Sequence, residues 1–584
     1  MRVIELKLST TLKIKTKVMM YKSFLILIVA FCSYSKIYAD SIFVDTGIAY
    51  KIVSEDSVNV VQRTDNKCYT QTFKDSLLII PSSIEHNGKN YMVKCIEKEA
   101  FVEWTGIKKI VINEGIEEIH DGVFMGCANL KAISIPSSVR TLGNSLFIYC
   151  ISLDSIVINK HNTTFDSRDG CNAIIRTENN TLLYGCKSTD IPSSVKTIDS
   201  YAYNGCMIKE VDIPTGVKRI NRAAFLDCPI LEKIHISSSV EEIENRPVIK
   251  CPNIVSITVD KNNKNYDSRE DCNAIIDKWQ EELILGCCTT NIPTGVFVIG
   301  KSAFEDCTNL HSITIPEGVG YIEDAAFMDC LNLKEVKLPS SLIRIEGGTN
   351  FGNCISLDSI YIPQNVERIP NSIFMGCISL QKIVVDKGNK VYDSRQNCNA
   401  IIRSESNYLT AGCKGSVIVD GIKYIGDRSF YKSGTTSVHI PASVEHIDST
   451  AFLQSKYLSS ITVDRNKAHY KSEDSNSIVE KKSNKMILAC HTTKILPCVT
   501  AIGIYAYVNT PPILVLPEGI ESVGYGVFLE CKDLHAIIIP ASVTKIDNYA
   551  FFDCQNLSGV VLRGGNTKIA PKAFSDCDKL KREL

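Results

Sequence analysis

The chain has 584 residues, a formal net charge of −1 and 44% hydrophobic residues. A net charge near zero argues against a general nucleic-acid binder, whose phosphate contacts need an excess of basic residues. The hydrophobic residues suffice for a large core, which excludes wholesale disorder. The 24 cysteines are too dilute for a small disulfide-stapled protein and too many for a typical cytosolic enzyme.

The N-terminal segment 1–39 is typical of a secretory signal peptide. Its apolar run Phe24–Phe31 has eight residues, whereas a membrane span needs about 20. The small residue Ala39 offers a cleavage site. Six basic residues precede the run: Arg2, Lys7, Lys13, Lys15, Lys17 and Lys22. We therefore expect an exported protein, secreted or held at the cell surface, with no transmembrane span in the mature chain.

Two details of this segment stay open. Met19 and Met20 stand just before Lys22, so the true start of the chain could lie at either methionine. Cys32 could carry a lipid, but the residue before it, Phe31, is bulky where lipidated cysteines follow a small residue. Lipidation is therefore the minority alternative.

Residues 40–92 are predicted to form an N-terminal β cap that leads into the rest of the chain. The runs Tyr50–Ile52 and Val58–Val60 alternate apolar and polar residues, as strands with one buried face do. Strands of this kind would cover the apolar end of the segment that follows, residues 93–584.

Residues 93–584 repeat one frame of about 23 residues. Ile133–Leu153 reads ISIPSSVRTLGNSLFIYCISL, and Ile313–Leu333 reads ITIPEGVGYIEDAAFMDCLNL. The shared frame is I-x-I-P-x-x-V-x-x-I-x-x-x-A-F-x-x-C-x-x-L. Val248 takes the aromatic position in one copy, and the others have Phe101, Phe124, Phe147, Tyr203, Phe225, Phe304, Phe327, Phe351, Phe374, Phe430, Phe452, Tyr507, Phe528, Phe551 and Phe574, which makes sixteen copies.

This repeat predicts a solenoid. The I-x-I triplet alternates as a half-buried strand does, and the Ala-Phe-x-x-Cys-x-x-Leu stretch has the i, i+3 spacing of a short helical turn. A single unit of this length cannot bury its own apolar residues, so the units must stack and share one continuous core. The length of the chain alone would suggest about four domains, but the repeat predicts one elongated solenoid.

Four steps between successive aromatic residues are longer than the rest. The step from Phe147 to Tyr203 is 56 residues, which is one repeat of 23 plus an insert of 33. The inserts lie near 159–190, 260–291, 386–417 and 464–494. In the first insert, two apolar runs, Ala173–Ile175 and Leu182–Tyr184, flank the polar turn Thr177–Asn180. This pattern predicts a β-hairpin that continues the wall of the solenoid.

Half of the cysteines share one position of the frame. Coils stacked about 4.8 Å apart hold neighbouring Cβ atoms wider than a disulfide allows. Ser433 and Ser455 replace the cysteine in two copies, which fits a weak hydrogen-bond donor rather than a bridge. We expect buried, reduced thiols at Cys127, Cys150, Cys206, Cys228, Cys251, Cys307, Cys330, Cys354, Cys377, Cys531, Cys554 and Cys577.

The cysteines of the inserts are a separate case. Three inserts carry a pair placed symmetrically about the turn, which would face each other across a hairpin: Cys171/Cys186, Cys272/Cys287 and Cys398/Cys413. The fourth insert has Ser475 in place of the first cysteine and keeps only Cys490. Bridged and reduced forms of these pairs stay open.

The repeats and inserts together resemble the BspA-type leucine-rich repeat family. The resemblance rests on the sixteen copies of the frame, on the insert motifs Asp-Ser-Arg and Asn-Ala-Ile-Ile, and on the lead-in Ile80–Phe101, and it covers roughly 77–580. It implies a leucine-rich-repeat solenoid of about sixteen coils, each a β-strand plus a short helical turn, with four β-hairpin inserts. It also implies a surface or secreted protein, since some members bind host matrix proteins or other bacteria.

The sequence has no constellation typical of catalysis, a cofactor or a metal. The ten histidines are scattered, without an H-E-x-x-H or H-x-H pattern. No G-x-S-x-G, P-loop or G-x-G-x-x-G motif stands in a strand-to-helix context. We therefore expect no enzyme activity and no cofactor, and we predict no catalytic, cofactor-binding or metal-binding residues.

The exposed face of the strands is the candidate binding surface. The middle residues of successive I-x-I triplets face outward and form a ladder, although an ordinary solvated sheet face is the alternative.

We hypothesise a non-catalytic protein-binding or adhesion solenoid whose partner is a protein or glycan on host or neighbouring cells, not nucleic acid. A spacer or scaffold at the cell surface is the alternative, and an enzyme that uses the inserts is less favoured. The candidate partner-binding residues are Thr258, Thr314, Lys337, Tyr361 and Val384.

Overall fold

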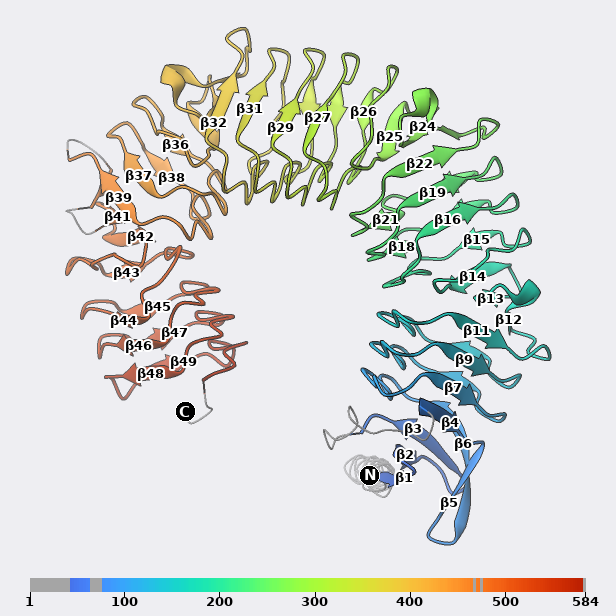
Figure 1. Cartoon of the computed structure of the whole chain (residues 1–584). Helices are drawn as coiled ribbons and strands as arrows, with labels where there is room; N and C mark the ends of the chain where they lie inside the picture. Colours follow the sequence, from blue (N-terminus) through green and yellow to red (C-terminus); the bar gives the residue numbers. More distant parts are fainter. Residues whose placement is uncertain (1–41, 64–75, 466–468, 473–475, 581–584) are drawn as a thin grey trace, which may run out of the picture. The chain divides into compact units, whose positions relative to one another are not determined.

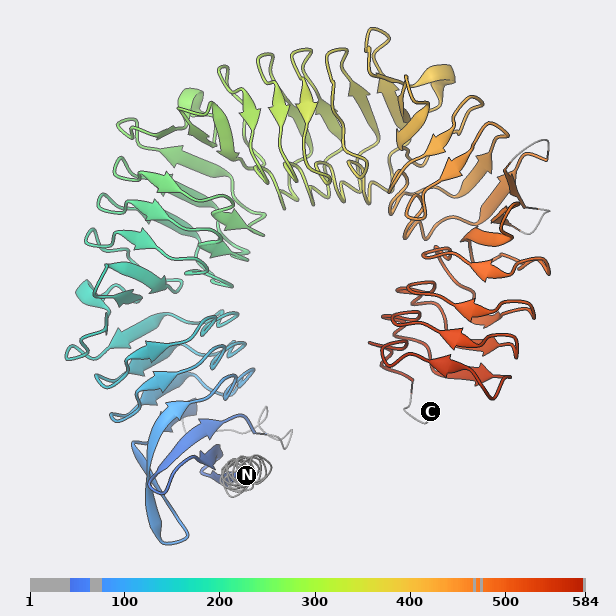
Figure 2. The same cartoon turned by 180° about the vertical axis from the view of Figure 1, so that it is seen from behind.

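The structure, a computed structural model, describes residues 42–63, 76–465, 469–472 and 476–580. The predicted signal peptide at 1–39 lies outside these residues. The chain divides into two compact units, Met1–Lys209 with Pro214–Pro229 and Glu210–Ile213 with Ile230–Leu584. Figures 1 and 2 show from opposite sides how successive coils stack beside one another within each unit. In the described part of the chain, no helix is both long and apolar enough to cross a membrane.

Each coil contributes a long and a short strand, and these form two ladders of parallel strands. The long strand carries the I-x-I triplet, whose outer residues are buried: Ile133 and Ile135 are 2% and 1% exposed. The strand β9 (Ala132–Ile135) pairs in parallel with β7 (Lys109–Ile112), with Ala132 opposite Lys109. A step of one repeat therefore places equivalent frame positions beside each other, which confirms the predicted solenoid.

The first unit begins with strands that extend the ladder of short strands. These are β1 (Ile42–Asp45), β2 (Ile48–Ile52), β3 (Ser57–Val61), β5 (Ser83–His86) and β6 (Lys89–Ile96). The strands β1, β2 and β3 are antiparallel, and β3 pairs in parallel with β6. The strand β6 then pairs in parallel with the first short strand, β8 (Glu118–Ile119). Tyr50, Val58 and Val60 from this region lie in the same hydrophobic cluster as the first coils.

The remaining strands of the first unit belong to the coils. Besides β7 and β9, the long strands are β4 (Leu77–Ile80) and β11 (Ser155–Ile158). Besides β8, the two-residue strands are β10 (Thr141–Leu142), β15 (Thr197–Ile198), β17 (Arg219–Ile220) and β18 (Phe225–Leu226).

The second unit repeats this pattern. Its long strands are β16 (Glu210–Ile213), β19 (Lys233–Ile236), β22 (Ser256–Val259), β27 (Ser312–Thr314), β29 (Glu335–Lys337), β31 (Ser359–Ile362), β32 (Lys382–Val385), β37 (Ser437–Ile440), β39 (Ser460–Val463), β44 (Ile513–Val515), β46 (Ala536–Ile539) and β48 (Gly559–Leu562). Its two-residue strands are β20 (Glu242–Ile243), β21 (Val248–Ile249), β26 (Val298–Ile299), β28 (Tyr321–Ile322), β30 (Arg344–Ile345), β36 (Tyr424–Ile425), β38 (His446–Ile447), β43 (Ala501–Ile502), β45 (Ser522–Val523), β47 (Lys545–Ile546) and β49 (Lys568–Ile569).

Each insert consists of three antiparallel strands, and the last of them joins the ladder of short strands. The first insert contains β12 (Phe165–Asp166), the single turn η3 (Arg168–Gly170), β13 (Ile174–Arg176) and β14 (Thr181–Tyr184). The strand β13 is antiparallel to both β12 and β14, and β14 pairs in parallel with β15. The insert thus takes the place of one coil in this ladder.

The other inserts have the same plan. They contain β23 (Tyr266–Asp267), η4 (Arg269–Asp271), β24 (Ile275–Asp277) and β25 (Glu282–Leu285); β33 (Tyr392–Asp393), η5 (Arg395–Asn397), β34 (Ile401–Arg403) and β35 (Tyr408–Ala411); and β40 (Tyr470–Lys471), β41 (Ser477–Glu480) and β42 (Lys485–Ala489).

The Asp-Ser-Arg motif fixes the start of the first insert. The guanidinium of Arg168 donates to the carboxylate of Asp166, with 2.7 Å between Nε and Oδ1. The hydroxyl oxygen of Ser167 accepts a hydrogen bond of 2.9 Å from the backbone N–H of Ile158, the last residue of β11. The motif therefore ties the insert to the preceding long strand, and the second and third inserts repeat both contacts.

The segment after the short strand forms consecutive turns, which refines the expected helical turn. The backbone N–H of Cys354 donates to the carbonyl of Phe351 at 3.2 Å, and the N–H of Leu357 donates to the carbonyl of Cys354 at 3.1 Å. Between them, Asn353 has a φ of 57°. A left-handed residue ends a right-handed helical path, so the i, i+3 spacing arises here from successive turns.

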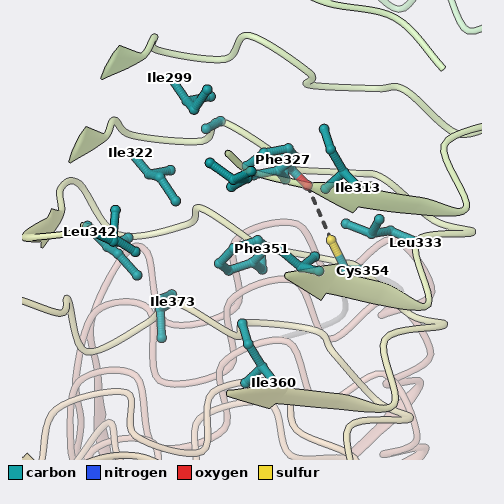
Figure 3. Packing of buried hydrophobic residues seen from close by; sticks show 14 of the residues in the cluster. Ile299, Ile313, Ile322, Phe327, Leu333, Leu342, Phe351, Cys354, Ile360 and Ile373 are labelled. Carbon is teal, nitrogen blue, oxygen red and sulfur yellow. Dashed lines mark hydrogen bonds between the residues drawn. The ribbon is translucent and has the colours of Figure 1, made fainter. Parts of the chain in front are cut away.

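The core of each unit is built from the repeated apolar positions. In Figure 3, Phe327 and Phe351 lie side by side among isoleucines and leucines of neighbouring coils. Their ring centroids are 5.4 Å apart and their planes differ by 6°. Similar stacks continue from Phe304 to Phe374. Stacking of equivalent side chains is the reason that the frame repeats an aromatic residue at this position.

Candidate functional site

The five residues of the predicted strand face lie on three separate sheets of the second unit. Thr258 is on β22, which pairs with β19. Thr314 and Lys337 face each other across β27 and β29. Tyr361 and Val384 face each other across β31 and β32. The structure pairs Thr314 with Lys337 and Tyr361 with Val384, and β29 also contacts β31, so these four residues lie on neighbouring strands, with Thr258 on a separate sheet.

The exposed face of these strands is polar and partly satisfied by its own hydrogen bonds. Four of the five residues are exposed, and Val384 is half-buried. The Thr258 hydroxyl lies 2.9 Å from Nδ1 of His235 on the next strand. The phenol of Tyr361 donates to Asp386, and this hydrogen bond raises the pKa of Tyr361 and lowers that of Asp386. No catalytic arrangement is formed by these groups.

A second candidate site lies elsewhere in the second unit, in a cavity of about 460 Å³. Three groups of turns line it, around residues 353–378, 432–457 and 505–533. Two side-chain contacts hold the second and third groups together: the amide of Gln454 donates to the carboxylate of Glu530, and the amide of Asn509 donates to the carbonyl of Lys456 at 2.6 Å. The volume lies in the range of small-ligand sites.

Aromatic and charged side chains share the lining of this cavity. Tyr457 is 42% exposed, and the ammonium group of Lys456 lies 5.2 Å from the centre of its ring. Tyr505 is half-buried and lies on the opposite group of turns. Lys532 and Asp533 are exposed beside them. Such a mixture offers both flat apolar surfaces and hydrogen-bonding groups to a ligand.

Two buried polar atoms in the lining have no hydrogen-bond partner among the described residues: the phenol oxygen of Tyr507 and the hydroxyl of Thr510. These residues are 5% and 2% exposed. Burial also raises the pKa of Tyr507, so its phenol stays protonated and remains a donor. Both atoms are buried from solvent, so they lie behind the accessible surface of the cavity; the phenol oxygen of Tyr203, at the same frame position after the first insert, is buried and unpartnered in the same way.

The repeat frame does not predict this cavity, although one residue of the sequence departs from the frame there. Tyr457 occupies the second x of the C-x-x-L part of the frame, where most copies have Asn or Ser, as at Asn332 and Ser356. Asn332 uses its amide to bind the carbonyl of Thr308 in the preceding coil at 2.8 Å. A tyrosine cannot replace that contact, so an aromatic residue here indicates a different local role.

The repeated cysteines form a ladder of thiol hydrogen bonds inside the core. The thiol of Cys354 donates to the carbonyl oxygen of Phe327 in the preceding coil at 3.2 Å, as the dashed line in Figure 3 shows. Cys127 makes the same bond to Phe101, also at 3.2 Å. Where serine replaces cysteine, the hydroxyl of Ser455 donates to the carbonyl of Phe430 at 2.5 Å. The position is therefore that of a small buried donor, as the sequence indicated.

The cysteines of the described residues are free thiols, including the pairs within the inserts. The thiol of Cys186 donates to the carbonyl of Asn172 at 3.2 Å, and that of Cys171 lies 4.0 Å from the carbonyl of Ala173. Both thiols thus contact backbone carbonyl groups of their own insert. Of the two alternatives that the sequence left open, a disulfide or two free thiols, the structure has the free thiols.

We expect the buried repeat cysteines to resist alkylation in the native protein. Burial raises the pKa of Cys127 to about 12, so at pH 8 only on the order of one thiol in ten thousand is the reactive thiolate. Iodoacetamide at pH 8 should leave these cysteines unmodified until the chain is unfolded, and should then label each once without prior reduction. Peptide mapping by mass spectrometry measures both states. A disulfide-linked peptide containing Cys307 and Cys330 would contradict the parallel ladder.

Comparison with protein families gives one match along nearly the whole chain. The family described as BspA type leucine-rich repeat region (6 copies) matches residues 66–172, 175–273, 286–402, 402–497 and 480–582. A search of curated proteins found no significant match.

Several solved structures are also similar. A leucine-rich cell surface protein of Faecalibacterium prausnitzii is 19% identical over 92% of this chain and 99% of that chain, with a TM-score of 0.31. The pneumococcal vaccine antigen PcpA is 16% identical over 73% and 94%, with a TM-score of 0.34. A leucine-rich repeat protein of Bacteroides ovatus is 20% identical over 92% and 93%, with a TM-score of 0.24. Identities and scores this low carry no argument about function.

Proposed function

The chain belongs to the BspA-type leucine-rich repeat family, and from this premise we propose that it is an exported, non-catalytic binding protein that works at the cell surface or in secreted form. Its partner in this proposal is a protein or glycan on a host or neighbouring cell. The sequence supports export through the signal-like segment 1–39, and the formal net charge of −1 makes nucleic acid an unsuitable partner.

The observation that carries the proposal is the cavity of about 460 Å³ in the second unit. Its lining combines two accessible aromatic residues, Tyr457 and Tyr505, with exposed charged groups, which is a mixture suited to recognition. Tyr457 and Tyr505 offer flat surfaces on which a sugar ring or an apolar side chain can pack. Lys532 and Asp533, which are exposed in the same lining, offer hydrogen bonds to polar groups of the ligand.

A candidate reaction centre would need a nucleophile or an acid–base pair in hydrogen-bond contact. The carboxylate of Glu530 in the cavity is instead bound by the amide of Gln454. The exposed Tyr361 with its partner Asp386 remains a second candidate contact surface on the strand face. Both surfaces have the chemistry of recognition and not of turnover.

The test is a binding array of extracellular-matrix proteins and glycans, probed with the purified full chain. We expect at least one bound partner, and we expect the double variant Tyr457→Ala/Tyr505→Ala to weaken that binding by about tenfold or more, as loss of aromatic anchors does. Trp279→Ala is the matched control, because this tryptophan is 80% exposed and lies outside the cavity.

Each other result counts against a stated part of the proposal. Absence of binding across the array would overturn the binding function in favour of a spacer or scaffold. Binding that Tyr361→Ala abolishes and the double variant leaves intact would move the site to the strand face. Turnover of a bound glycan would show an enzyme.

A further inference from the structure

A group of three metal-binding side chains lies on the sheet at the start of the first unit. Cys95 on β6 and Glu118 on β8 face each other across the parallel pair of strands. His120 follows two residues after Glu118, so both side chains point to the same side of the strand, while Ile119 between them is buried. The three donor atoms lie within 4.8 Å of one another.

The spacing of these atoms is that of ligands around a metal ion. The thiol sulfur of Cys95 is 3.4 Å from Nε2 of His120, and the same nitrogen is 3.1 Å from Oε2 of Glu118. A tetrahedral zinc ion with bond lengths of about 2.0–2.3 Å holds its ligand atoms roughly 3.3–3.6 Å apart. Shifts of a few tenths of an ångström would therefore convert the observed group into a coordination sphere.

Only weak hydrogen bonding links the thiol to the other two side chains. Both Cys95 and Glu118 approach the same nitrogen of His120. The carboxylate accepts from that nitrogen when it carries a proton, and the thiol sulfur is then only a weak acceptor of the same proton. In a catalytic relay the acid would hold the other ring nitrogen, so this arrangement is unsuited to activating the thiol. All three donor atoms lie within 4.8 Å of one another, so one cation can replace these hydrogen bonds.

The surroundings favour a positive charge. Glu97, two residues after Cys95, adds a second carboxylate near the thiol. Burial is the main cause of the raised pKa of Cys95, and the negative charges of Glu118 and Glu97 contribute to it. Glu97 is itself held by the amide of Asn59 at 2.9 Å and by Lys51 at 4.0 Å, so it supports the site without being required as a ligand.

Exposure decides what kind of site this is. Cys95 is 6% exposed, His120 is half-buried and Glu118 is exposed. An ion held by these three residues would keep a fourth position open to solvent, unlike a closed structural site with four protein ligands. Thiolate, imidazole and carboxylate together are a donor set that suits zinc and its neighbours better than calcium or magnesium.

We propose that Cys95, Glu118 and His120 form a binding site for a divalent metal ion of the zinc class, which links β6 to β8 and leaves one coordination position open. Binding forms a bond from the ion to each side chain and releases the proton of the Cys95 thiol to solvent. The ion joins the N-terminal strands to the first coil, so it should also stabilise that end of the unit.

The test uses the full chain without an affinity tag, freed of metal by a chelator and kept reduced. Zinc is titrated against a chromophoric indicator, and cobalt is added as a spectroscopic probe. We expect one tight site per chain, a thiolate-to-cobalt charge-transfer band, and a higher melting temperature when zinc is present. Cys95→Ser should remove the band, and His120→Gln should weaken zinc binding by about tenfold or more.

Two further variants keep the result decisive. Cys288→Ser is the control, because Cys288 is a partly exposed thiol in the second unit, and it should leave the band and the affinity unchanged. If Cys95→Ser fails to fold, Glu118→Gln at an exposed position should still weaken binding. The proposal is overturned if the unmodified chain shows no thiolate–cobalt band, or if zinc binds equally well to the Cys95→Ser and Glu118→Gln variants.

Discussion

Replacement of Phe327 by alanine should lower the free energy of unfolding by about 3–5 kcal/mol, the range for removal of a fully buried aromatic side chain. Phe327 has no exposed surface. Its ring stacks on Phe304 at 5.1 Å on one side and on Phe351 at 5.4 Å on the other. The substitution therefore leaves a cavity that faces two coils at once, and rigid strands on both sides prevent it from closing.

The damage should remain near the altered coil, because each coil of a solenoid contacts only its neighbours. Denaturant unfolding gives the stability change, and hydrogen exchange locates it: amides of β27 and β29 should exchange faster, whereas those of β46 should not. Trp279→Ala removes an even larger aromatic side chain that is 80% exposed, and it should change stability by less than about 0.5 kcal/mol. Equal stability of the two variants would show that the aromatic position is not the core position.

The buried positions of the coils could be predicted from the sequence because one frame determines them. The outer residues of I-x-I, the aromatic residue and the cysteine are spaced for one 23-residue coil, and stacking leaves each of them only one environment. The frame also explains why Ser455 can replace cysteine: both side chains donate to the carbonyl of the aromatic residue one coil before. The family assignment from the same residues was confirmed.

The short strands and the turns were harder to predict. A two-residue strand such as Tyr321–Ile322 has too few residues to show an alternating pattern. The i, i+3 spacing of the turns is the spacing of a helix, and only the left-handed φ of residues such as Asn353 distinguishes the two. Backbone conformation of a non-glycine residue leaves little trace in a sequence.

The candidate sites depend on contacts between residues that the frame does not link. The cavity joins turns that are far apart in the chain, such as those of Asn353 and Tyr505. The proposed metal-binding group differs from the cavity in this respect. Cys95 lies one repeat of 23 residues before Glu118, which places the two on adjacent strands, but ligands spread over two coils form no short sequence motif.

A glycine in each of the first three inserts lies directly against the first aromatic ring of the coil that follows. A Cβ atom on Gly286 would be 2.2 Å from Cε1 of Phe304, and one on Gly185 would be 2.3 Å from the same atom of Tyr203. The fourth insert has Ala489 at this position. There the following ring, Tyr507, is inclined by 32° to the next ring of its stack, whereas the Phe304 and Phe327 planes differ by 10°.

We therefore expect Gly286→Ala to destabilise the protein by about 1–3 kcal/mol, since the new methyl group must push Phe304 out of its stack. The backbone of Gly286 is not in the left-handed region, so strain of the main chain does not contribute, and the loss of chain entropy in the unfolded state would by itself favour alanine by about 0.4–1 kcal/mol. Gly565→Ala is the matched control, because nothing lies within 4 Å of its Cβ position, and it should be neutral or slightly stabilising.

Denaturant unfolding compares the stabilities of the two variants, and a crystal structure of Gly286→Ala should show the Phe304 ring tilted as Tyr507 is. A Gly286→Ala variant that is as stable as the parent, with Phe304 still parallel to Phe327, would mean that the backbone of the neighbouring coil shifts to make room for the methyl group. The glycine would then have a role other than avoiding this contact.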